Sequence, residues 1–202
     1  MTAENGPLGE AHDVATRHLA RLAETLLRIP SEPLGRAVDL LLTTRAAGRR
    51  VWVFGNGGSA AIASHLVCDL TKTAARAGEA PLRSFALTDN LPLLTAWAND
   101  TAYERVYAAQ IEMLVDRDDA VIAISSSGQS PNIVAAVRSA QARGARIIAL
   151  VGFDGGATLD LADVAIHVPI HDYGIVEDAH AAVGHALAAA VRASPGEAMS
   201  EP

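Results

Sequence analysis

Short apolar runs alternate with helical segments along most of the chain. The apolar runs at 50–54, 82–87, 120–125, 146–151 and 164–169 predict strands. The segments near 59–73, 91–97, 101–115, 131–143, 156–162 and 175–192 predict helices. A regular βα alternation is typical of a parallel sheet with helices on both faces. The sequence therefore predicts an α/β fold, a three-layer αβα sandwich around a five-stranded parallel sheet.

Two further helices are predicted ahead of the first strand. Apolar residues have helical spacing from His12 to about Arg28, where Pro30 ends the pattern, and again from about Pro33 to Ala47. Neither segment carries a chemical motif, so their apolar stripes predict an N-terminal helical arm that contacts another subunit. Residues 1–10 and 195–202 are expected to be flexible, and residues 11–194 to form a single domain that includes the arm.

Composition narrows the class of protein. The 202 residues are 50% hydrophobic, enough for one sizeable core. The net charge of −7 comes with no run of Lys or Arg, so neither nucleic acid nor an anionic membrane is an expected partner. No window is apolar enough for a membrane span and no signal sequence is visible, so we expect a cytoplasmic protein. The single cysteine, Cys68, excludes an intrachain disulfide and is predicted to be buried.

A glycine-rich turn, Phe54-Gly-Asn-Gly-Gly-Ser59, follows the first predicted strand. Its glycines let the backbone approach a ligand closely, and the free N–H groups of the next helix favour an anion. His65 and Asp69 follow within that helix, four residues apart, so both lie on one face. This stretch therefore predicts a phosphate-compatible loop together with half of a metal site or an acid/base site.

A second loop, rich in hydroxyl groups, follows the third predicted strand. Ser125, Ser126, Ser127 and Ser130 stand there, just ahead of Pro131 at the start of a helix. Such a loop can bind phosphate through hydroxyls, backbone N–H groups and the helix dipole, without Lys or Arg. The alternative is that Ser130 only caps the helix. Because parallel strands end at one edge of the sheet, both loops are expected at the same ligand-binding edge.

Several segments together resemble the sugar isomerase (SIS) domain and, within it, the phosphoheptose isomerase family. They are Gly55–Ala60, Leu94–Asp100, Ser125–Asn132, Asp154–Gly156 and Glu177–His185. The resemblance extends from about residue 14 to residue 192 and implies a flavodoxin-like sheet. It also implies an isomerase that converts sedoheptulose 7-phosphate into a heptose 7-phosphate of the D-glycero-D-manno type. The family's sites lie between the subunits of a homotetramer.

The resemblance assigns roles to individual residues. The implied substrate-binding residues are Asn56, Gly57, Gly58, Asn99, Asp100, Ser125, Ser126, Ser127, Ser130 and Glu177. The implied ligands of one divalent metal, zinc in the family, are His65, Asp69, Glu177 and His185, and the implied catalytic residues are Asp69 and His185. Two positions depart from the family pattern: Asp69 is one methylene shorter than the family's Glu, and Glu177 replaces a Gln.

Spacing within the last predicted helix limits how these ligands can meet. Glu177 and His185 are eight residues apart, about 12 Å along a helix axis and rotated by roughly 80°. One straight helix cannot easily direct both at one ion, so either the helix begins after Glu177 or neighbouring subunits combine their residues. Glu177 and His180, three residues apart, form a local alternative pair. The resemblance favours His185 over His180.

These groups suit aldose–ketose isomerisation through an enediol. Asp69 or Glu177 would remove the proton next to the carbonyl, and His185 would move the oxygen-bound proton. A divalent metal would stabilise the developing oxyanion. Three other hypotheses for the function stay open. They are an isomerase for another ketose phosphate, a sugar-phosphate sensor, and a non-enzymatic SIS protein similar to the DnaA initiator-associating protein. The chelating residue types at Asp69 and His185 favour an enzyme over the last of these.

Overall fold

Five parallel strands form the centre of the molecule, as predicted. The computed structural model describes residues 7–194. The strands are β1 (Arg50–Gly55), β2 (Arg83–Ala86), β3 (Ala120–Ser125), β4 (Arg146–Gly152) and β5 (Val164–Val168), in the order β2-β1-β3-β4-β5. Every neighbouring pair is parallel. The strand order reverses between β1 and β3, which is where open α/β sheets bind ligands.

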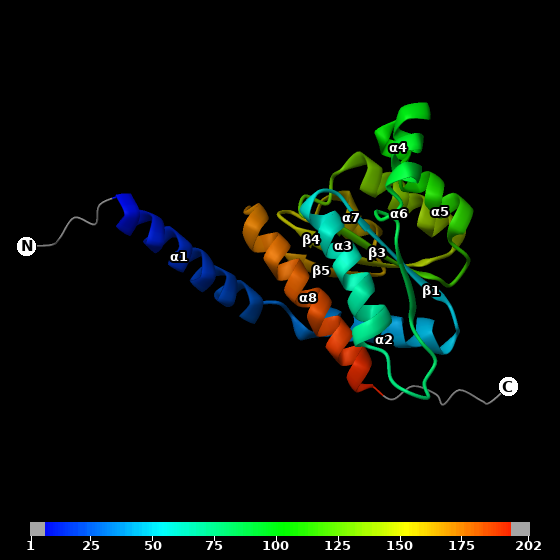
Figure 1. Ribbon diagram of the computed structural model, residues 1–202, viewed down its shortest axis with the longest axis horizontal. Coiled ribbons are helices and arrows are strands. Elements are labelled where there is room, and N and C mark those ends of the chain that lie inside the picture. Colours follow the sequence, from blue (N-terminus) through cyan, green and yellow to red (C-terminus); the bar gives the residue numbers. More distant parts are fainter. Residues whose placement is uncertain (1–6, 195–202) are drawn as a thin grey trace, which may run out of the picture.

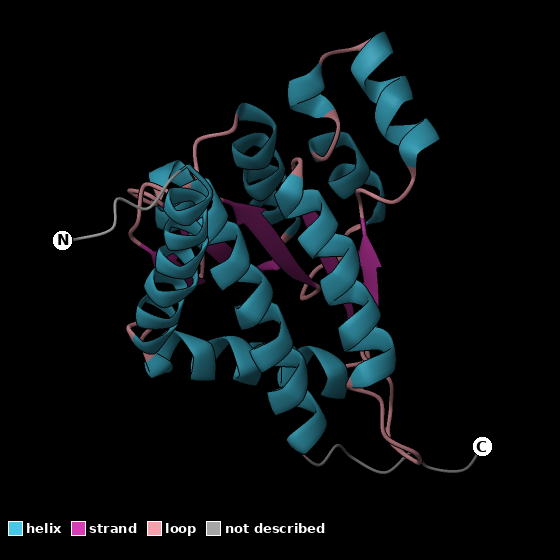
Figure 2. Ribbon diagram, turned by 60° about the vertical axis from the view of Figure 1, so that its left-hand side comes forward, coloured by secondary structure: helices cyan, strands magenta, loops and turns pink. Residues whose placement is uncertain are grey.

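Helices cover both faces of this sheet and complete the αβα sandwich (Figures 1 and 2). They are α1 (Pro7–Leu27), α2 (Ser31–Ala46), α3 (Gly58–Cys68), α4 (Leu91–Asp100), α5 (Ala108–Leu114), α6 (Pro131–Arg143), α7 (Gly156–Leu161) and α8 (Tyr173–Ala193). A 3₁₀ turn at Tyr103–Arg105 interrupts the single helix predicted over 101–115. Within residues 7–194, no helix combines the length and the apolar character needed to cross a bilayer.

The central strands are continuously apolar because each of their faces packs against helices. On β1, Val51 and Val53 join one core with α2, α3 and α8, while Trp52 and Phe54 join a second core with α5 and α6. Successive side chains of a strand point to opposite faces of the sheet. Because helices cover both faces here, the side chains on each face are buried and apolar. This accounts for the unbroken apolar runs from which the strands were predicted.

The N-terminal helices differ from the predicted two-helix arm. Ala37 and Leu41 of α2 are fully buried in the first core, so α2 belongs to the sandwich. Only α1 extends away from the body (Figure 1). It begins at Pro7, so residues 7–10, which were predicted to be flexible, are helical; proline is well suited to a first helical turn. Residues 1–6 and the predicted tail, 195–202, lie outside the described residues.

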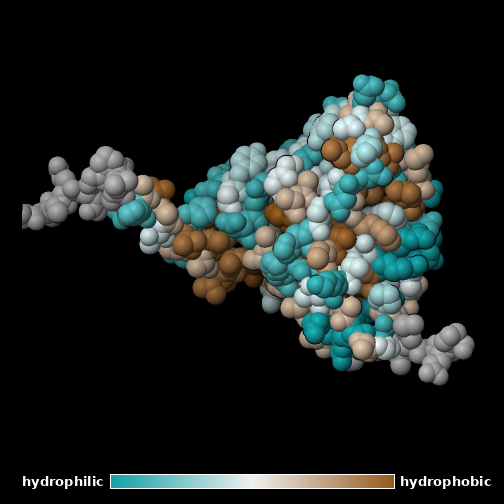
Figure 3. All heavy atoms as spheres, viewed as in Figure 1, coloured by the Kyte–Doolittle hydropathy of each residue, from teal (hydrophilic) through white to brown (hydrophobic). Residues whose placement is uncertain are grey.

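Helix α1 is attached to α8 by apolar packing, in which Leu22 and Leu26 lie against Val176 and Ala179, and by two polar contacts. Arg21 Nη1 donates to Asp172 Oδ2 at 2.9 Å, and His18 Nε2 lies 3.3 Å from Asp178 Oδ2. Farther along its surface α1 exposes apolar side chains, with Leu19 66% exposed, and a hydrophobic area lies where the arm meets the body (Figure 3). The described residues therefore cover only part of the apolar surface of this amphipathic helix.

The predicted helix over 59–73 is in fact two structures. Helix α3 ends at Cys68, and a π-helical turn continues from Asp69 to Thr73. Thr73 Oγ1 donates to Asp69 Oδ1 at 3.0 Å, which steadies the carboxylate at the junction. Cys68 is exposed rather than buried, because it lies on a side of α3 that the sheet does not cover. Single π turns within α-helices are frequently found at functional sites.

Asp119 joins the start of β1 to the start of β3. This carboxylate is 1% exposed. Its Oδ1 accepts from the backbone N–H of Arg50 at 2.9 Å, and its Oδ2 accepts from Trp52 Nε1 at 2.8 Å and from the N–H of Asp116 at 3.1 Å. A buried carboxylate with three donors fixes the register of the strands that carry both predicted ligand loops.

We expect Asp119→Ala to lower the free energy of unfolding by about 3 kcal/mol, because buried donors would lose their acceptor. Urea denaturation with circular dichroism measures the change. The matched control is Asp118→Asn, an exposed neighbour with φ 65°, a conformation that Asn tolerates. Equal stability of Asp119→Ala and the control protein would show that Asp119 does not hold these strands together.

Candidate functional site

Helices α3 and α8 carry most of the predicted site residues. Both follow a parallel strand, so both start at the carboxyl edge of the sheet, and they run side by side in the same direction (Figure 1). The two helices are held together by a shared core. It contains Ala63 and Leu66 of α3 and Val183 and Leu187 of α8. Residues of the two helices therefore meet along a shared groove.

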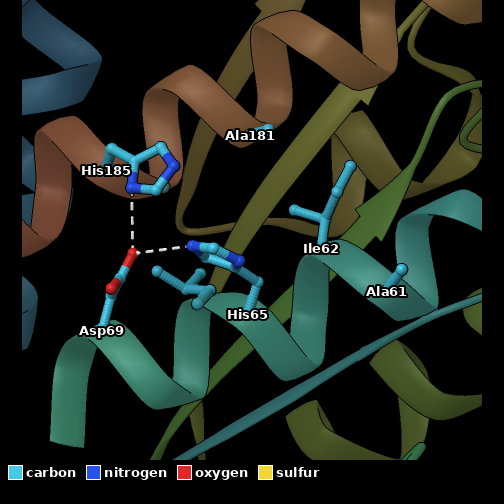
Figure 4. A pocket seen from close by; sticks show the side chains of 8 residues that line it. Ala61, Ile62, His65, Asp69, Ala181 and His185 are labelled. Atoms are coloured by element: carbon cyan, nitrogen blue, oxygen red, sulfur yellow. Dashed lines mark ion pairs between the residues drawn. The ribbon is translucent and has the colours of Figure 1, made fainter. Parts of the chain in front are cut away.

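His65, Asp69 and His185 come together on the outer side of this groove (Figure 4). Asp69 Oδ2 lies 3.3 Å from His65 Nε2 and 2.9 Å from His185 Nδ1. The two imidazole rings meet edge to face, with centroids 4.9 Å apart. The groove has a volume of about 290 Å³ and its wall between the polar groups is formed by residues such as Ile62 and Ala181.

The donor set of this group fits a divalent metal ion. Asp69 Oδ2 is buried and accepts no hydrogen bond, although two imidazole nitrogens lie close to it. One ligand atom from each of the three residues lies within 4.8 Å of the others. Two imidazoles and a carboxylate, with a fourth position open, are a typical zinc ligand set. The side chains of His65 and His185 are 62% and 59% exposed, so solvent or a further group can reach that position.

The prediction that His65 and Asp69 lie on one face of a helix, four residues apart, agrees with this geometry. His185 of α8 is the third member of the cluster. Glu177 is not a member of the cluster within one chain. Helix α8 begins at Tyr173, so the alternative in which the helix begins after Glu177 is wrong. The remaining alternative, in which neighbouring subunits combine their residues, stays a prediction.

His180, the local alternative to His185, lies on the other side of α8. It is fully buried against the sheet, and neither ring nitrogen has a hydrogen-bond partner among the described residues. Burial lowers its pKa to about 4. The structure therefore places His180 in the core and His185 beside Asp69.

Glu177 instead lies at the carboxyl edge, against the glycine-rich turn. Gly58 leaves space beside the Glu177 carboxylate, and a Cβ at this position would displace the end of that flexible side chain. Gly57 has φ 53°, in the left-handed region where glycine is favoured. The backbone conformation thus accounts for glycine at position 57, and the space next to Glu177 accommodates the glycine at position 58.

The serine loop forms a second, smaller pocket beside Glu177. Its volume is about 100 Å³. The lining residues are Asn56, Ser59, Ile124, Ser125, Ser126, Ser127, Ser130, Tyr173 and Glu177. All four predicted serines therefore meet with Asn56, as the position of both loops at one sheet edge predicted.

The hydroxyl groups of this pocket are not all used within the loop. Ser125 Oγ accepts from the N–H of Gly128 at 3.1 Å, and Ser127 Oγ accepts from that of Gln129 at 3.3 Å. Ser126 Oγ is buried without a partner, and Ser130 makes no side-chain cap for α6. The hydroxyls of Ser126 and Ser130 are therefore free for a ligand, which disfavours the helix-cap alternative.

The loop is held in shape by a backbone contact with the β4–α7 turn. Gly128 has φ 62°, and a Cβ there would collide with the carbonyl oxygen of Gly155. Thr158 donates to the Gly128 carbonyl through its N–H at 3.1 Å and its hydroxyl at 2.8 Å. The glycines of the Asp154–Gly156 segment thus allow two loops to touch. Sequence reasoning missed Thr158, which has no motif of its own.

Asn56 is fixed by residues that the sequence did not single out. Its amide exchanges two hydrogen bonds with the Asn132 amide, at 2.9 and 2.8 Å, and Tyr103 Oη donates to Asn56 Oδ1 at 3.1 Å. Asn132 belongs to the Ser125–Asn132 segment that resembles the family, so its place near the site could have been inferred from the sequence. Tyr103 has no such signal because its segment was predicted only as a helix.

Asn99 and Asp100 are not brought to either pocket. They form the end of α4, where both are exposed and Asn99 Nδ2 donates to Asp100 Oδ1 at 2.8 Å. No residue of α4 is buried. Their predicted contact with the substrate has no counterpart among the pocket residues of a single chain and stays a prediction.

Comparison with known proteins gives consistent matches. A model of the SIS domain family matches residues 15–152. Phosphoheptose isomerase of Paramagnetospirillum magneticum is 38% identical over 180 residues, covering 88% of this chain and 93% of that protein. Lincomycin biosynthesis protein LmbN of Streptomyces lincolnensis is 37% identical, covering 79% of this chain and 62% of that protein. The structure of phosphoheptose isomerase GmhA from Neisseria gonorrhoeae superposes with a TM-score of 0.83 at 30% identity, covering 91% and 98% of the two chains.

The buried His180 predicts a pH dependence of stability. Since its folded pKa is about 4 against an ordinary 6.5, the unfolded chain takes up a proton below pH 6.5 that the folded chain does not. The contribution of His180 to the free energy of unfolding is therefore greatest above pH 6.5, and it decreases as the pH falls toward 4. Between pH 7 and pH 5 we expect a loss of about 2 kcal/mol that His180→Leu lacks.

Urea denaturation at several pH values measures this difference between the two proteins. His12→Gln, which removes an exposed histidine of α1, is the control and should keep the full dependence. The same slope in the wild type and in His180→Leu would contradict the assignment.

Proposed function

The chain belongs to the SIS domain family and, within it, to the phosphoheptose isomerases, and we propose that it converts sedoheptulose 7-phosphate into a heptose 7-phosphate of the D-glycero-D-manno type. The observation that carries this proposal is the group of His65, Asp69 and His185 in one groove. The serine pocket at the top of the same two helices supports it, since a phosphosugar needs an anion site and a reacting site together.

The serine pocket would hold the phosphate group. The free hydroxyls of Ser126 and Ser130 line the same pocket, and Ser130 is the residue that precedes the start of α6. Hydroxyls, backbone N–H groups and a helix N-terminus can bind a phosphate without a cationic side chain. Anchoring one end of the sugar in this way positions its carbonyl carbons and lowers the entropic part of the barrier.

His65, Asp69 and His185 would hold the divalent metal, zinc by their donor types. When bound, such an ion supplies Lewis-acid polarisation of the sugar's carbonyl and hydroxyl oxygens. Glu177 lies about two turns of α8 from His185, so as a fourth ligand it would have to come from a second copy of the chain. Thr73 holds the other Asp69 oxygen and so fixes the direction of the carboxylate.

The chain's own groups would carry the protons of an enediol mechanism. Asp69 removes the proton from the carbon next to the carbonyl and returns it to the neighbouring carbon. His185, exposed beside it, moves the oxygen-bound proton, a task that suits imidazole because it exchanges protons near neutral pH. Glu177 is the alternative base, since it is the carboxylate nearer the serine pocket.

A homotetramer with sites between subunits is part of this proposal, as is action in the cytoplasm. Two observations support the assembly. Asn99 and Asp100 lie on an exposed helix away from both pockets, where a second copy could use them. The outer side of the His65 and His185 cluster is open to solvent. A partner copy at that face would complete the ligand set.

An isomerase for another ketose phosphate is the second candidate. A relative with a different name, the lincomycin biosynthesis protein, is about as similar as the phosphoheptose isomerases are. The shorter carboxylate of Asp69 and the carboxylate of Glu177 change the reach and the charge of the site. Comparing turnover of ketose phosphates of seven and eight carbons separates the two candidates.

We expect purified protein to isomerise sedoheptulose 7-phosphate, to lose the activity after treatment with a chelator, and to regain it with zinc. His185→Ala should lose both bound zinc and activity, at least a hundredfold in kcat/KM, because it removes a ligand and a proton carrier. Product formation followed by NMR, together with metal analysis, measures both quantities. Binding without turnover, whatever metal or ketose phosphate is supplied, would favour a sensor and contradict the isomerase.

Ser126→Ala tests the phosphate pocket independently of the metal. Losing one hydrogen bond to a charged group should raise KM about tenfold or more and leave bound zinc unchanged. Ser139→Ala, which removes a serine bonded to Glu112 outside both pockets, is the matched control. An unchanged KM for Ser126→Ala would place the phosphate elsewhere.

A further inference from the structure

Asp69 lies on the π turn that follows α3 and not on α3 itself. The turn runs from Asp69 to Thr73, and the N–H of Ala74 donates to the Asp69 carbonyl at 2.8 Å. Hydrogen bonding of this kind is rare and is mostly confined to single turns. The distance between the Asp69 carboxylate and His185 on α8 therefore depends on contacts that keep the π turn in place against α8.

Arg192, in the last turn of α8, makes such a contact. Its Nη1 donates to the carbonyl oxygen of Thr73 at 2.5 Å. Thr73 is the last residue of the π turn, and the end of a helix leaves carbonyl groups without a donor from the helix itself. A cationic donor makes a stronger hydrogen bond than a neutral one, and a cation is favoured at the C-terminal end of a helix. Arg192 thus attaches the π turn to α8.

This contact closes a ring of interactions around the carboxylate. Thr73 accepts from Arg192 through its carbonyl and donates to Asp69 Oδ1 through its hydroxyl, at 3.0 Å. Asp69 Oδ2 in turn lies 2.9 Å from His185 Nδ1. His185 and Arg192 are two helical turns apart on α8 and differ in direction by only about 20°, so they lie on one face. The ring leaves α8 at Arg192 and returns to it at His185.

The end of α8 that carries Arg192 is itself held by two other arginines. Arg76, which follows the π turn, donates through Nη1 to the Arg192 carbonyl at 3.4 Å. Arg45 of α2 donates through Nη2 to the Ser194 carbonyl at 3.2 Å and is only 6% exposed. Glu79 lies 3.2 Å from Arg76 Nε and 3.6 Å from Arg45 Nη1. Arg192 therefore acts from an anchored helix end.

We infer that Arg192 is a positioning residue for the proposed metal site and that it acts through Thr73. The inference rests on the proposed function, because that function includes a metal held by Asp69. Arg192 lines neither the metal groove nor the serine pocket, so its effect concerns the carboxylate and not the phosphate group. Residues that hold a metal ligand in position typically contribute about ten- to a hundredfold to metal affinity.

The test is zinc binding by full-length protein, measured by competition with a chromophoric chelator of known affinity. Arg192→Ala and Thr73→Val should each weaken zinc binding about tenfold. The double variant should bind zinc no more weakly than Thr73→Val alone, because without the hydroxyl Arg192 no longer acts on the carboxylate. Arg138→Ala, which removes an exposed arginine of α6 outside both pockets, is the matched control and should bind zinc as the wild type does.

Cobalt substitution gives a second measurement that a purely structural role would not change. The visible absorption of bound Co²⁺ depends on the geometry of its ligands, so a displaced carboxylate should alter the bands in Arg192→Ala but not in Arg138→Ala. Circular dichroism shows which variants are folded. Arg192→Gln, which also loses the cationic donor but keeps part of the side-chain stem, serves for the same measurements if the alanine variant does not fold.

Each outcome decides the inference. Wild-type zinc affinity in folded Arg192→Ala would overturn it and leave the proposed function intact. Losses that add up in the double variant would also overturn it, because Arg192 would then act by a route other than Thr73. No zinc binding by the wild type would reject the proposed metal site and the inference together. The expected pattern of zinc affinities without turnover of any ketose phosphate would contradict the isomerase and support the inference.

Discussion

The reversal of strand order between β1 and β3 is the constraint on which the rest of the structure depends. All five strands are parallel, so every segment that leaves them for a helix does so at the same edge. At the reversal, the chain leaves β1 and β3 in diverging directions and opens a crevice. The glycine turn after β1 and the serine loop after β3 line that crevice, and Asp119 fixes the two strands beneath it.

Two kinds of ligand group lie at different positions along the pair of helices α3 and α8. The end nearest the sheet edge has hydroxyls, backbone N–H groups and one carboxylate, and the part about two turns farther on has imidazoles around Asp69. Asp69 marks the boundary between α3 and the π turn, where the backbone changes its winding. The two carboxylate oxygens of Asp69 have different neighbours. Oδ1 accepts a hydrogen bond from Thr73, and Oδ2 faces His65 and His185.

Much of this arrangement could be predicted from the sequence, and the reasons are local. The strands are apolar runs because both of their faces are buried, and His65 meets Asp69 because helical spacing alone requires it. What could not be predicted depends on contacts between distant segments. The burial of Ala37 and Leu41 makes α2 part of the sandwich, and the core position of His180 depends on how α8 lies on the sheet. The exposure of Cys68 likewise depends on which side of α3 the sheet covers. The family resemblance supplied the assignment of His185, which spacing left open against His180.

The backbone contact between Gly128 and Gly155 has a consequence for how this protein can change over evolutionary time. Two loops that touch through main-chain atoms, with Thr158 bonded to the same carbonyl, cannot be lengthened or reshaped one at a time. A mutation in either loop would have to be matched in the other. New substrate preferences are therefore more accessible through side chains on α3 and α8, which line the two pockets, than through the phosphate loop itself. The departures from the family pattern lie there: Glu177 is on α8, and Asp69 begins the π turn that follows α3.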